Sequence, residues 1–462
     1  MKKLQIILLF SIAILSSCSE DVIFIEDPFV VAFKETSGKL LEIDIQKDIE
    51  LIYSETAYEE SIVKIRITTE NVLYGRDFIT IPAAEGNELS IPIKINEIEN
   101  KFQIVELNNS FTDVMKITFS ISSIEQDNTS IQGNVSHELS DSAYLGGVFY
   151  PTVGGPNEPN QVYVDLSSNK ETVVRRDAWD LGFYGGEEFR VSINGSLYMA
   201  VSSLPNTDIN SVNSSSVAAL KPMVAVGTFN PQNEVYVDGP NGNILETAIS
   251  EISEDDFNNP VYLVNLGVEI GTEQPNAGSV AIAGDSRGWK KIRILRDSNN
   301  YILQYADLDA TSYNEISISK DTDFNFTFFS FKNNGIVNVE PQKLQWDISF
   351  TVFTNIIAGA GSYGFSDFCL HNRKGGVTSY SLVDNNITYE NFTTSNINDS
   401  LLQESQVVIG SSWRNVFDRT ANSNIYYVLK DANNNYFKIR FLDLVNENGE
   451  RGFPRFEYTL LQ

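Results

Sequence analysis

Cysteine and histidine are scarce in this chain, which has two of each among its 462 residues. Beyond the first eighteen residues Cys369 is the only thiol, so an internal disulfide is excluded and stability must come from core burial. No Ser-His-Asp or Cys-His set suggests itself, and there is no H-E-x-x-H motif, cysteine cluster or P-loop. Carboxylates are plentiful, yet no acid pair stands at a spacing that favours a paired-acid hydrolase. The sequence therefore predicts a protein that is not an enzyme and holds no metal.

Basic residues are also few, because 33 Lys and Arg stand against 61 Asp and Glu, a formal net charge of −28. Nucleic acids and anionic lipid surfaces are bound through basic clusters, so this balance argues against both partners. Beyond residue 18 no apolar run approaches the roughly 20 residues that a membrane-spanning helix needs. What the chain does have is aromatic area for hydrophobic cores, from 28 Phe, 20 Tyr and 4 Trp.

The N-terminus has the pattern of a secretory signal. Lys2 and Lys3 precede the apolar run Leu4–Leu15, and small residues lead to Cys18. The stretch resembles the lipobox of bacterial lipoproteins, in which the cysteine thiol receives a diacylglycerol. We therefore predict a lipoprotein signal peptide over residues 1–17 and lipid attachment at Cys18, with a plain signal peptide as the alternative.

The residues after Cys18 bear on the location of the protein. Ser19 is followed at once by the acids Glu20 and Asp21. This order resembles the signal that moves Bacteroidetes lipoproteins to the outer face of the outer membrane. It predicts a lipid-anchored tether over residues 18–28 and a cell-surface protein of the outer membrane, with the periplasmic face as the alternative.

Short strands dominate residues 29–124. In Ser61–Thr68 and Leu89–Ile95, apolar residues alternate with polar ones, which is typical of half-buried strands with one wet face. Several such runs at short spacing predict a small immunoglobulin-like β-sandwich. The stretch Tyr74–Pro82 followed by the second strand resembles Calx-β modules. Some of these bind calcium, but no dense set of acids is present here, so the favoured interpretation is a structural spacer.

Residues 125–141 are polar and rich in Asn and Ser, which predicts a linker. An internal repeat follows. The motif Trp-Asp-Leu-Gly-Phe at Trp179 recurs as Trp-Asp-Ile-Ser-Phe at Trp346, and an aromatic strand precedes each copy. An Asp-Ser-Asn-Asn and an Asp-Ala-Asn-Asn-Asn segment between apolar runs predict two hairpin turns. We expect two tandem β-rich copies, residues 142–320 and 321–462, and an all-β fold class overall.

Several landmarks of this region keep their order and together resemble one family. The region resembles the HmuY family of Bacteroidetes surface lipoproteins over about residues 142–462. The landmarks are the two Trp-Asp motifs, Gly375–Val377, Ile409–Arg414, Tyr426–Lys430 and Arg451–Tyr458. The resemblance implies an all-β domain. For the family's best-known members it also implies a haemophore that takes haem from host proteins and passes it to an outer-membrane receptor.

The haem ligands that the resemblance implies, a pair of axial histidines or methionines, are hard to find in this chain. His137 lies in the predicted linker, where we expect it to face water, and His371 lies in the second copy. Met199 has the sequence context of a strand, where methionine packs in a core more often than it binds iron. His371 and Met199 are the candidate haem ligands, and tyrosine ligation is the alternative, for which no single residue stands out.

Two functions therefore stay open. The first is a surface lipoprotein that captures a ligand, with haem as the candidate from the family and a haem-protein and an outer-membrane receptor as possible partners. The second is a structural or protein-interaction lipoprotein that keeps the scaffold without binding haem. A titration with hemin distinguishes them, and fold resemblance alone does not.

Overall fold

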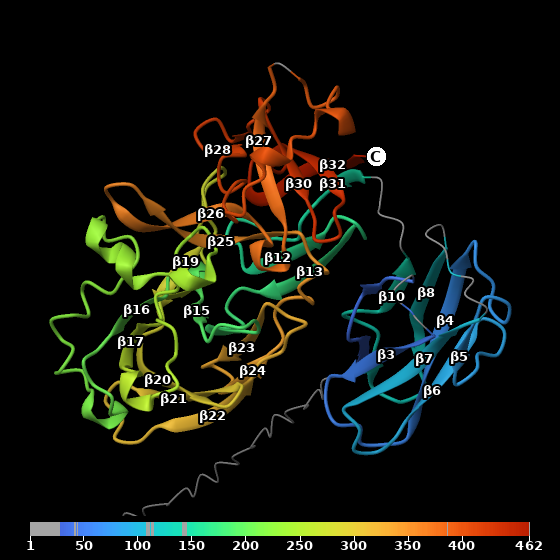
Figure 1. The fold of residues 1–462 in the computed structure, drawn as a ribbon, viewed down its shortest axis with the longest axis horizontal. Coiled ribbons are helices and arrows are strands. Elements are labelled where there is room, and N and C mark those ends of the chain that lie inside the picture. The colour runs from blue at the N-terminus through green and yellow to red at the C-terminus, as the bar shows by residue number, and fades with distance from the viewer. Residues whose placement is uncertain are drawn as a thin grey trace, which may run out of the picture. The chain divides into compact units, whose positions relative to one another are not determined.

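The computed structural model describes residues 28–461, apart from residues 41, 42, 44, 108–110, 112–114, 141–145 and 386. The chain divides into two compact units, Met1–Leu139 and Ser140–Gln462 (Figure 1). Strands dominate both units, and the all-β fold class is confirmed. No helix in the described part is long and apolar enough to cross a membrane. The predicted signal peptide and Cys18 lie outside the described residues.

Unit 1 is a β-sandwich of two five-stranded sheets that enclose one hydrophobic core. The alternation seen in the sequence positions the strands, since in β4 (Ser61–Glu70) the apolar residues Val63, Ile65 and Ile67 are buried while Arg66 and Thr68 between and after them are exposed. The first sheet runs β5 (Phe78–Ile81), β7 (Glu99–Glu106), β3 (Gln46–Tyr53), β1 (Phe29–Phe33), β9 (Thr129–Ser130). The second runs β2 (Ser37–Gly38), β10 (Ser136–Ser140), β8 (Lys116–Ile124), β4 (Ser61–Glu70), β6 (Glu88–Ile93).

The segment expected as a linker, residues 125–141, contributes strands β9 and β10 to the two sheets of unit 1. His137 on β10 is 1% exposed, and its Nδ1 lies 2.9 Å from the Glu35 carbonyl oxygen. The expectation that His137 faces water was wrong. Polar composition suggested a linker, but the alternation of His137 and Leu139 with polar neighbours gives this strand one buried face.

Unit 2 contains two four-stranded sheets, which we call motif sheets because the Trp-Asp motifs lead into them. Motif sheet 1 runs β13 (Lys170–Arg175), β12 (Asn160–Asp165), β25 (Ile348–Ile357), β26 (Gly361–His371). Motif sheet 2 runs β15 (Val191–Ile193), β14 (Leu181–Tyr184), β23 (Phe326–Ser330), β24 (Gly335–Val337).

Two five-stranded outer sheets cover the motif sheets, each through a separate core. Motif sheet 2 shares a core with one outer sheet, and motif sheet 1 shares a core, which includes the buried thiol of Cys369, with the other. The first outer sheet runs β16 (Ala200–Ser203), β17 (Val261–Asn265), β20 (Trp289–Asp297), β21 (Asn300–Asp307), β22 (Asn314–Ser319). The second runs β11 (Gly146–Phe149), β32 (Arg451–Leu461), β31 (Tyr436–Val445), β30 (Ile425–Lys430), β27 (Thr378–Val383).

Short elements complete unit 2. Two strand pairs stand apart from the large sheets, β18 (Val268–Ile270) with β19 (Ala283–Ser286) and β28 (Arg414–Asn415) with β29 (Thr420–Ala421). Among the described residues of unit 2 the helices are 3-10 turns: η1 (Gly195–Leu197), η2 (Ile209–Ser211), η3 (Pro231–Tyr236), η4 (Ile244–Glu246), η5 (Asp256–Asn258), η6 (Arg373–Gly375), η7 (Thr394–Asn396), η8 (Asp399–Leu401). The two predicted hairpin turns join β20 to β21 and β30 to β31, with Ser298 and Asn434 at positive φ.

The two sequence copies, expected as tandem modules, are interleaved within one unit. The β12–β13 hairpin of the first copy pairs with β25 of the second, and the β23–β24 hairpin of the second copy pairs with β14 of the first (Figure 1). Each motif sheet therefore takes two strands from each copy, and neither copy completes its sheet alone.

Candidate functional site

The aspartate of each Trp-Asp motif binds the hairpin that the other copy contributes to the same motif sheet. Asp180 Oδ2 accepts a hydrogen bond from Phe331 N at 2.7 Å, and Asp347 Oδ2 accepts one from Leu166 N at 2.8 Å. Each carboxylate therefore binds the backbone just after the hairpin strand of the other copy. Both aspartates are buried, so the motif acid is a structural element rather than a solvated group.

The tryptophans of the motif pack edge-on against aromatic residues of the exchanged hairpins. The Trp179 and Phe328 ring centroids are 4.8 Å apart at 71°, and those of Trp346 and Tyr163 are 4.9 Å apart at 76°. These four side chains belong to one buried cluster, which joins the two motif sheets. Edge-to-face geometry is the favoured arrangement of aromatic pairs.

A cavity lies within this region of unit 2, between residues of the two motif sheets. Its volume is about 160 Å³. Motif sheet 1 contributes Tyr163, Ser349 and Thr351, while Phe326 and Phe328 come from motif sheet 2. Because strand side chains alternate between faces, Val164, Phe350 and Phe329 enter the two cores, while residues beside them line the cavity.

Gly182 on β14 leaves room for the rings of Phe326 and Phe328, which belong to the aromatic wall of the cavity. It pairs with Phe328 across the sheet, and a Cβ at Gly182 would lie 3.2 Å from the Phe326 ring and 3.3 Å from the Phe328 ring. A larger residue would press both rings towards the cavity. The glycine of the first motif copy thus has a packing reason for its presence.

Three residues that line the cavity each have a buried polar atom without a hydrogen-bond partner among the described residues: Trp346 Nε1, Ser349 Oγ and Thr351 Oγ1. Their side chains are 9%, 1% and 3% exposed, respectively. Buried polar groups in native proteins are almost always paired, and each unpaired one carries an energetic penalty. The wall of this one cavity therefore contains three polar groups that the described residues leave without a hydrogen-bond partner.

Charged side chains also line the cavity, and burial shifts their protonation. The Glu340 carboxyl accepts a hydrogen bond from Phe326 N at 2.8 Å, and burial raises its pKa to about 8, opposed by the charge of Lys374. Burial lowers the pKa of Lys374 to about 8, and its Nζ donates to the Gly242 carbonyl oxygen at 3.0 Å. At neutral pH Glu340 is therefore mainly an uncharged carboxylic acid that donates as well as accepts.

The segment 238–251 forms another part of the cavity wall, and two carboxylates attach it to motif sheet 2. Asp238 accepts hydrogen bonds from Ala248 N at 2.9 Å and from Ile193 N at 3.0 Å. Burial raises the pKa of Asp238 to about 6, which these backbone donors oppose. Several residues of this segment that line the cavity are partly exposed, so the cavity reaches solvent here.

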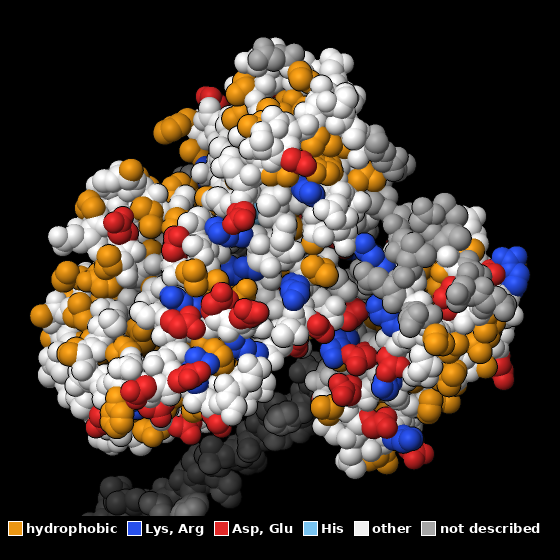
Figure 2. Space-filling model, in the orientation of Figure 1, with side chains coloured by type: hydrophobic (Ala, Val, Ile, Leu, Met, Phe, Trp, Pro, Cys, Tyr) orange, Lys and Arg blue, Asp and Glu red, His pale blue; other side chains and the backbone are white. Residues whose placement is uncertain are grey.

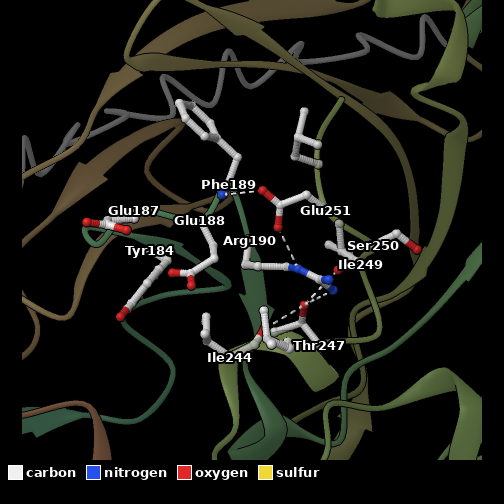
Figure 3. Close-up of polar contacts among 12 residues, drawn as sticks. Tyr184, Glu187, Glu188, Phe189, Arg190, Ile244, Thr247, Ile249, Ser250 and Glu251 are labelled. Atoms are coloured by element: carbon white, nitrogen blue, oxygen red, sulfur yellow. Dashed lines mark hydrogen bonds and ion pairs between the residues drawn. The ribbon is translucent and has the colours of Figure 1, made fainter. Parts of the chain in front are cut away.

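Figure 3 shows the second attachment, at Glu251. One carboxylate oxygen of Glu251 accepts from Phe189 N at 2.7 Å and the other from Arg190 Nε at 2.8 Å. The Phe189 ring is itself held between two cations, with the Arg296 guanidinium 3.7 Å and Lys320 Nζ 3.8 Å from its centroid. This cluster fixes one end of the wall segment and has no role in the cavity interior.

Comparison with known proteins gives a family for unit 2. The model of the HmuY protein family matches residues 157–317 and 322–458, which is more than half of the chain. The chain belongs to the HmuY family. No curated protein matches it.

Solved structures resemble the chain only weakly. An apo-form Calx CBD1 domain matches with 9% identity and a TM-score of 0.20, over 24% of this chain and 96% of that one. A Calx CBD2 domain matches with 12% identity and a TM-score of 0.20, over 24% and 83%. A putative carbohydrate binding protein from Bacteroides ovatus matches with 7% identity and a TM-score of 0.16, over 62% and 71%. At these scores the likenesses carry no argument about function.

The structure brings both haem-ligand candidates of this HmuY-family chain, His371 and Met199, into the wall of the same cavity. His371, at the end of β26, has no free ring nitrogen. Its Nδ1 lies 2.8 Å from Ser379 Oγ, and its Nε2 donates to the Glu404 carbonyl oxygen at 3.0 Å. Burial lowers the pKa of His371 to about 4, so the ring is neutral. Met199 is fully buried in the core of the first outer sheet.

These residues do not fit haem. An axial histidine must offer a nitrogen to the iron, and both nitrogens of His371 are already bonded. The volume of about 160 Å³ also falls below the about 300–1,000 Å³ of pockets that enclose drug-sized ligands, and a porphyrin is larger still. Within the described part of the chain no group of three or more His, Cys, Asp or Glu could hold a metal ion.

Sequence reasoning missed the polar groups that distinguish this cavity. A signal for Ser349 and Thr351 was present, since they alternate with the core residues Ile348 and Phe350 and so share the non-core face of their strand. Glu340 had no signal, because its burial depends on the packing of segments far apart in the chain. On the face drawn in Figure 2, the described Lys and Arg lie among Asp and Glu rather than in a basic patch of their own.

Proposed function

We propose that this HmuY-family protein is a non-catalytic surface lipoprotein that captures a small organic ligand in the cavity between its motif sheets. The observation that carries the proposal is the set of three unpaired polar atoms, Trp346 Nε1, Ser349 Oγ and Thr351 Oγ1, on one cavity wall. A purely structural module gains nothing from them, because unpaired buried polar groups lower stability. A site that binds a ligand requires such groups to orient it.

Haem, the candidate from the family, is disfavoured as that ligand. We expect a hemin titration of the purified protein to give no sharp low-spin Soret band at micromolar hemin, because His371 is saturated and Met199 is in a core. A sharp band that is lost in His371→Ala or Met199→Ala would overturn this part of the proposal.

Lipid attachment at Cys18 supplies the envelope anchor in this proposal, and unit 1 acts as a spacer between that anchor and unit 2. The basis is the signal-like N-terminus and the sandwich fold of unit 1. We expect the wild-type chain to incorporate radiolabelled palmitate and to be cleaved by protease added to intact cells. Cys18→Ser is expected to lose the label. Labelled protein that resists protease until the cells are lysed would place it on the periplasmic face instead.

The ligand-capture proposal is tested by a thermal-shift screen of single-ring compounds. We expect at least one compound to raise the melting temperature of the wild-type protein and to have less effect on Thr351→Val. If no compound and no hemin stabilises the protein, the alternative function stands: a structural or protein-interaction lipoprotein that retains the HmuY scaffold.

A further inference from the structure

The size of the cavity restricts the ligand to a single ring. A cavity of about 150 Å³ accepts one benzene molecule, and the cavity here measures about 160 Å³. One six-membered ring fits within such a volume. Any larger molecule must leave its remaining part outside, past the partly exposed segment 238–251.

The wall on motif sheet 1 requires a ligand with several uncharged hydrogen-bonding groups. Ser349 and Thr351 are two residues apart on β25 and so lie on the same face of the strand, and each hydroxyl can both donate and accept a hydrogen bond. Trp346 Nε1 only donates, so it needs an acceptor. A flat hydrocarbon or simple aromatic ring would leave all three groups unpaired, which makes such a ligand a poor fit.

Other parts of the wall are aromatic. Trp179, Phe326 and Phe328 line the cavity beside the polar groups of motif sheet 1. A saturated sugar ring matches both kinds of wall, because its faces carry C–H groups and its rim carries hydroxyls. The C–H faces bury against aromatic surface while the hydroxyls donate to and accept from the polar side chains.

The charges at the cavity favour a neutral compound. The Glu340 carboxyl is mainly protonated at neutral pH, and it adds another uncharged donor and acceptor. Lys374 and Arg373 are cations of the wall. Lys374 Nζ already donates to the Gly242 carbonyl oxygen and lies 5.2 Å from the Phe326 ring centroid, and Arg373 donates to the Asn241 carbonyl oxygen and the Glu404 carboxylate. Asp238 repels anions from the same wall. An acidic ligand would lose its hydration shell here without gaining a free cation.

We infer that the cavity binds one uncharged pyranose ring, as a free monosaccharide or as the terminal unit of a glycan. This inference rests on the proposed ligand-capture function and names the chemical class of its ligand. The hydroxyl rim of the sugar supplies partners to Trp346, Ser349 and Thr351, and its C–H face covers the aromatic wall.

Isothermal titration calorimetry of the purified full-length protein tests the inference. The probes are D-glucose, D-galactose, D-mannose and N-acetyl-D-glucosamine, with D-glucuronate, indole and hemin for comparison. We expect at least one neutral sugar to bind with a dissociation constant between about 10 µM and 1 mM, and D-glucuronate to bind at least about tenfold more weakly.

Two variants locate the binding site. Thr351→Val and Ser349→Ala are expected to weaken sugar binding by about tenfold each, because each removes one hydrogen bond to the ligand. Thr327→Val is the matched control. This threonine lies on β23 between Phe326 and Phe328, its hydroxyl donates to the Ser319 carbonyl oxygen at 3.0 Å, and it does not line the cavity. It should bind sugar as the wild type does.

The outcomes separate the inference from the proposed function. If indole or D-glucuronate binds in a Thr351-dependent way and no neutral sugar does, ligand capture stands and the sugar class is wrong. If a neutral sugar binds equally to wild type, Thr351→Val and Ser349→Ala, the sugar site lies elsewhere and the inference is overturned. If none of the probes binds, the inference fails, and the single-ring screen decides the proposed function separately.

Discussion

Two threonines on one strand, Thr351 and Thr354, allow the stability cost of an unpaired hydroxyl in the cavity wall to be measured without a ligand. Both are nearly fully buried, at 3% and 5% exposure. Thr354 Oγ1 donates to the Gly195 carbonyl oxygen at 2.6 Å, whereas Thr351 Oγ1 has no partner among the described residues. The substitution of valine for threonine replaces a hydroxyl by a methyl group of similar size, so it isolates the hydrogen-bonding term.

The two substitutions should change stability in opposite directions. An unpaired buried hydroxyl costs about 1–3 kcal/mol relative to an apolar group, so Thr351→Val is expected to raise the free energy of unfolding by about 1–2 kcal/mol. Thr354→Val leaves the Gly195 carbonyl without its donor and should lower that free energy by about 1–3 kcal/mol. The pair is thus expected to differ by roughly 2–5 kcal/mol.

Urea unfolding followed by tryptophan fluorescence measures this difference. All four tryptophans, Trp179, Trp289, Trp346 and Trp413, lie in unit 2, so the signal reports that unit and not the separate sandwich. Thr351→Val should shift the urea midpoint upwards with an unchanged slope. If it lowers the midpoint as much as Thr354→Val does, the Thr351 hydroxyl is paired in the free protein. In that case, the argument that the cavity awaits a ligand is refuted.

Three further predictions follow from the buried acids and the glycine of the motif region. Burial raises the pKa of Glu340 from 4.5 to about 8, so the folded state binds this proton more tightly than the unfolded state does, and the stability that the proton contributes is lost as pH rises from 4.5 through 8. The free energy of unfolding of Glu340→Gln, measured by urea unfolding at pH 5 to 8.5, should therefore fall less with rising pH than that of the wild type. Parallel curves for the two proteins would contradict the assignment. Asp180→Asn should lower the free energy of unfolding by about 3–5 kcal/mol, because it removes the carboxylate 2.7 Å from buried Arg287 and leaves that guanidinium, among the described residues, only the exposed carboxylate of Glu269, at 3.8 Å. Asp347→Asn keeps an acceptor for Leu166 N and should lower the free energy of unfolding by only about 1 kcal/mol. Equal losses of stability in the two variants would show that the ion pair with Arg287 does not explain the effect of Asp180→Asn. Gly182→Ala should displace the Phe326 and Phe328 rings. We expect its effect on the free energy of ligand binding, measured by calorimetry, to exceed its effect on the free energy of unfolding, measured by urea unfolding.

Local patterns were enough to predict the strands and the repeat. Alternation of apolar and polar residues identified β4 and β6, and the Asn-rich turns identified two hairpins, because both signals act over a few residues. Polar composition misled at residues 125–141, where it concealed the buried face of β10. The candidate ligands His371 and Met199 were found by residue type, and the sequence could not show that hydrogen bonds and core packing already occupy them.

The sequence by itself determined an all-β chain with a repeated Trp-Asp motif and few residues suited to catalysis or metal binding. Tertiary structure alone decided that the copies exchange hairpins. The hydrogen bond from Leu166 N to Asp347 joins residues 181 positions apart, and both hairpins carry the same local signals, so short-range patterns do not reveal which strand each hairpin pairs with. The cavity is a consequence of that exchange. It forms where two sheets built from both copies meet, and only there do Trp346, Ser349 and Thr351 become buried without partners.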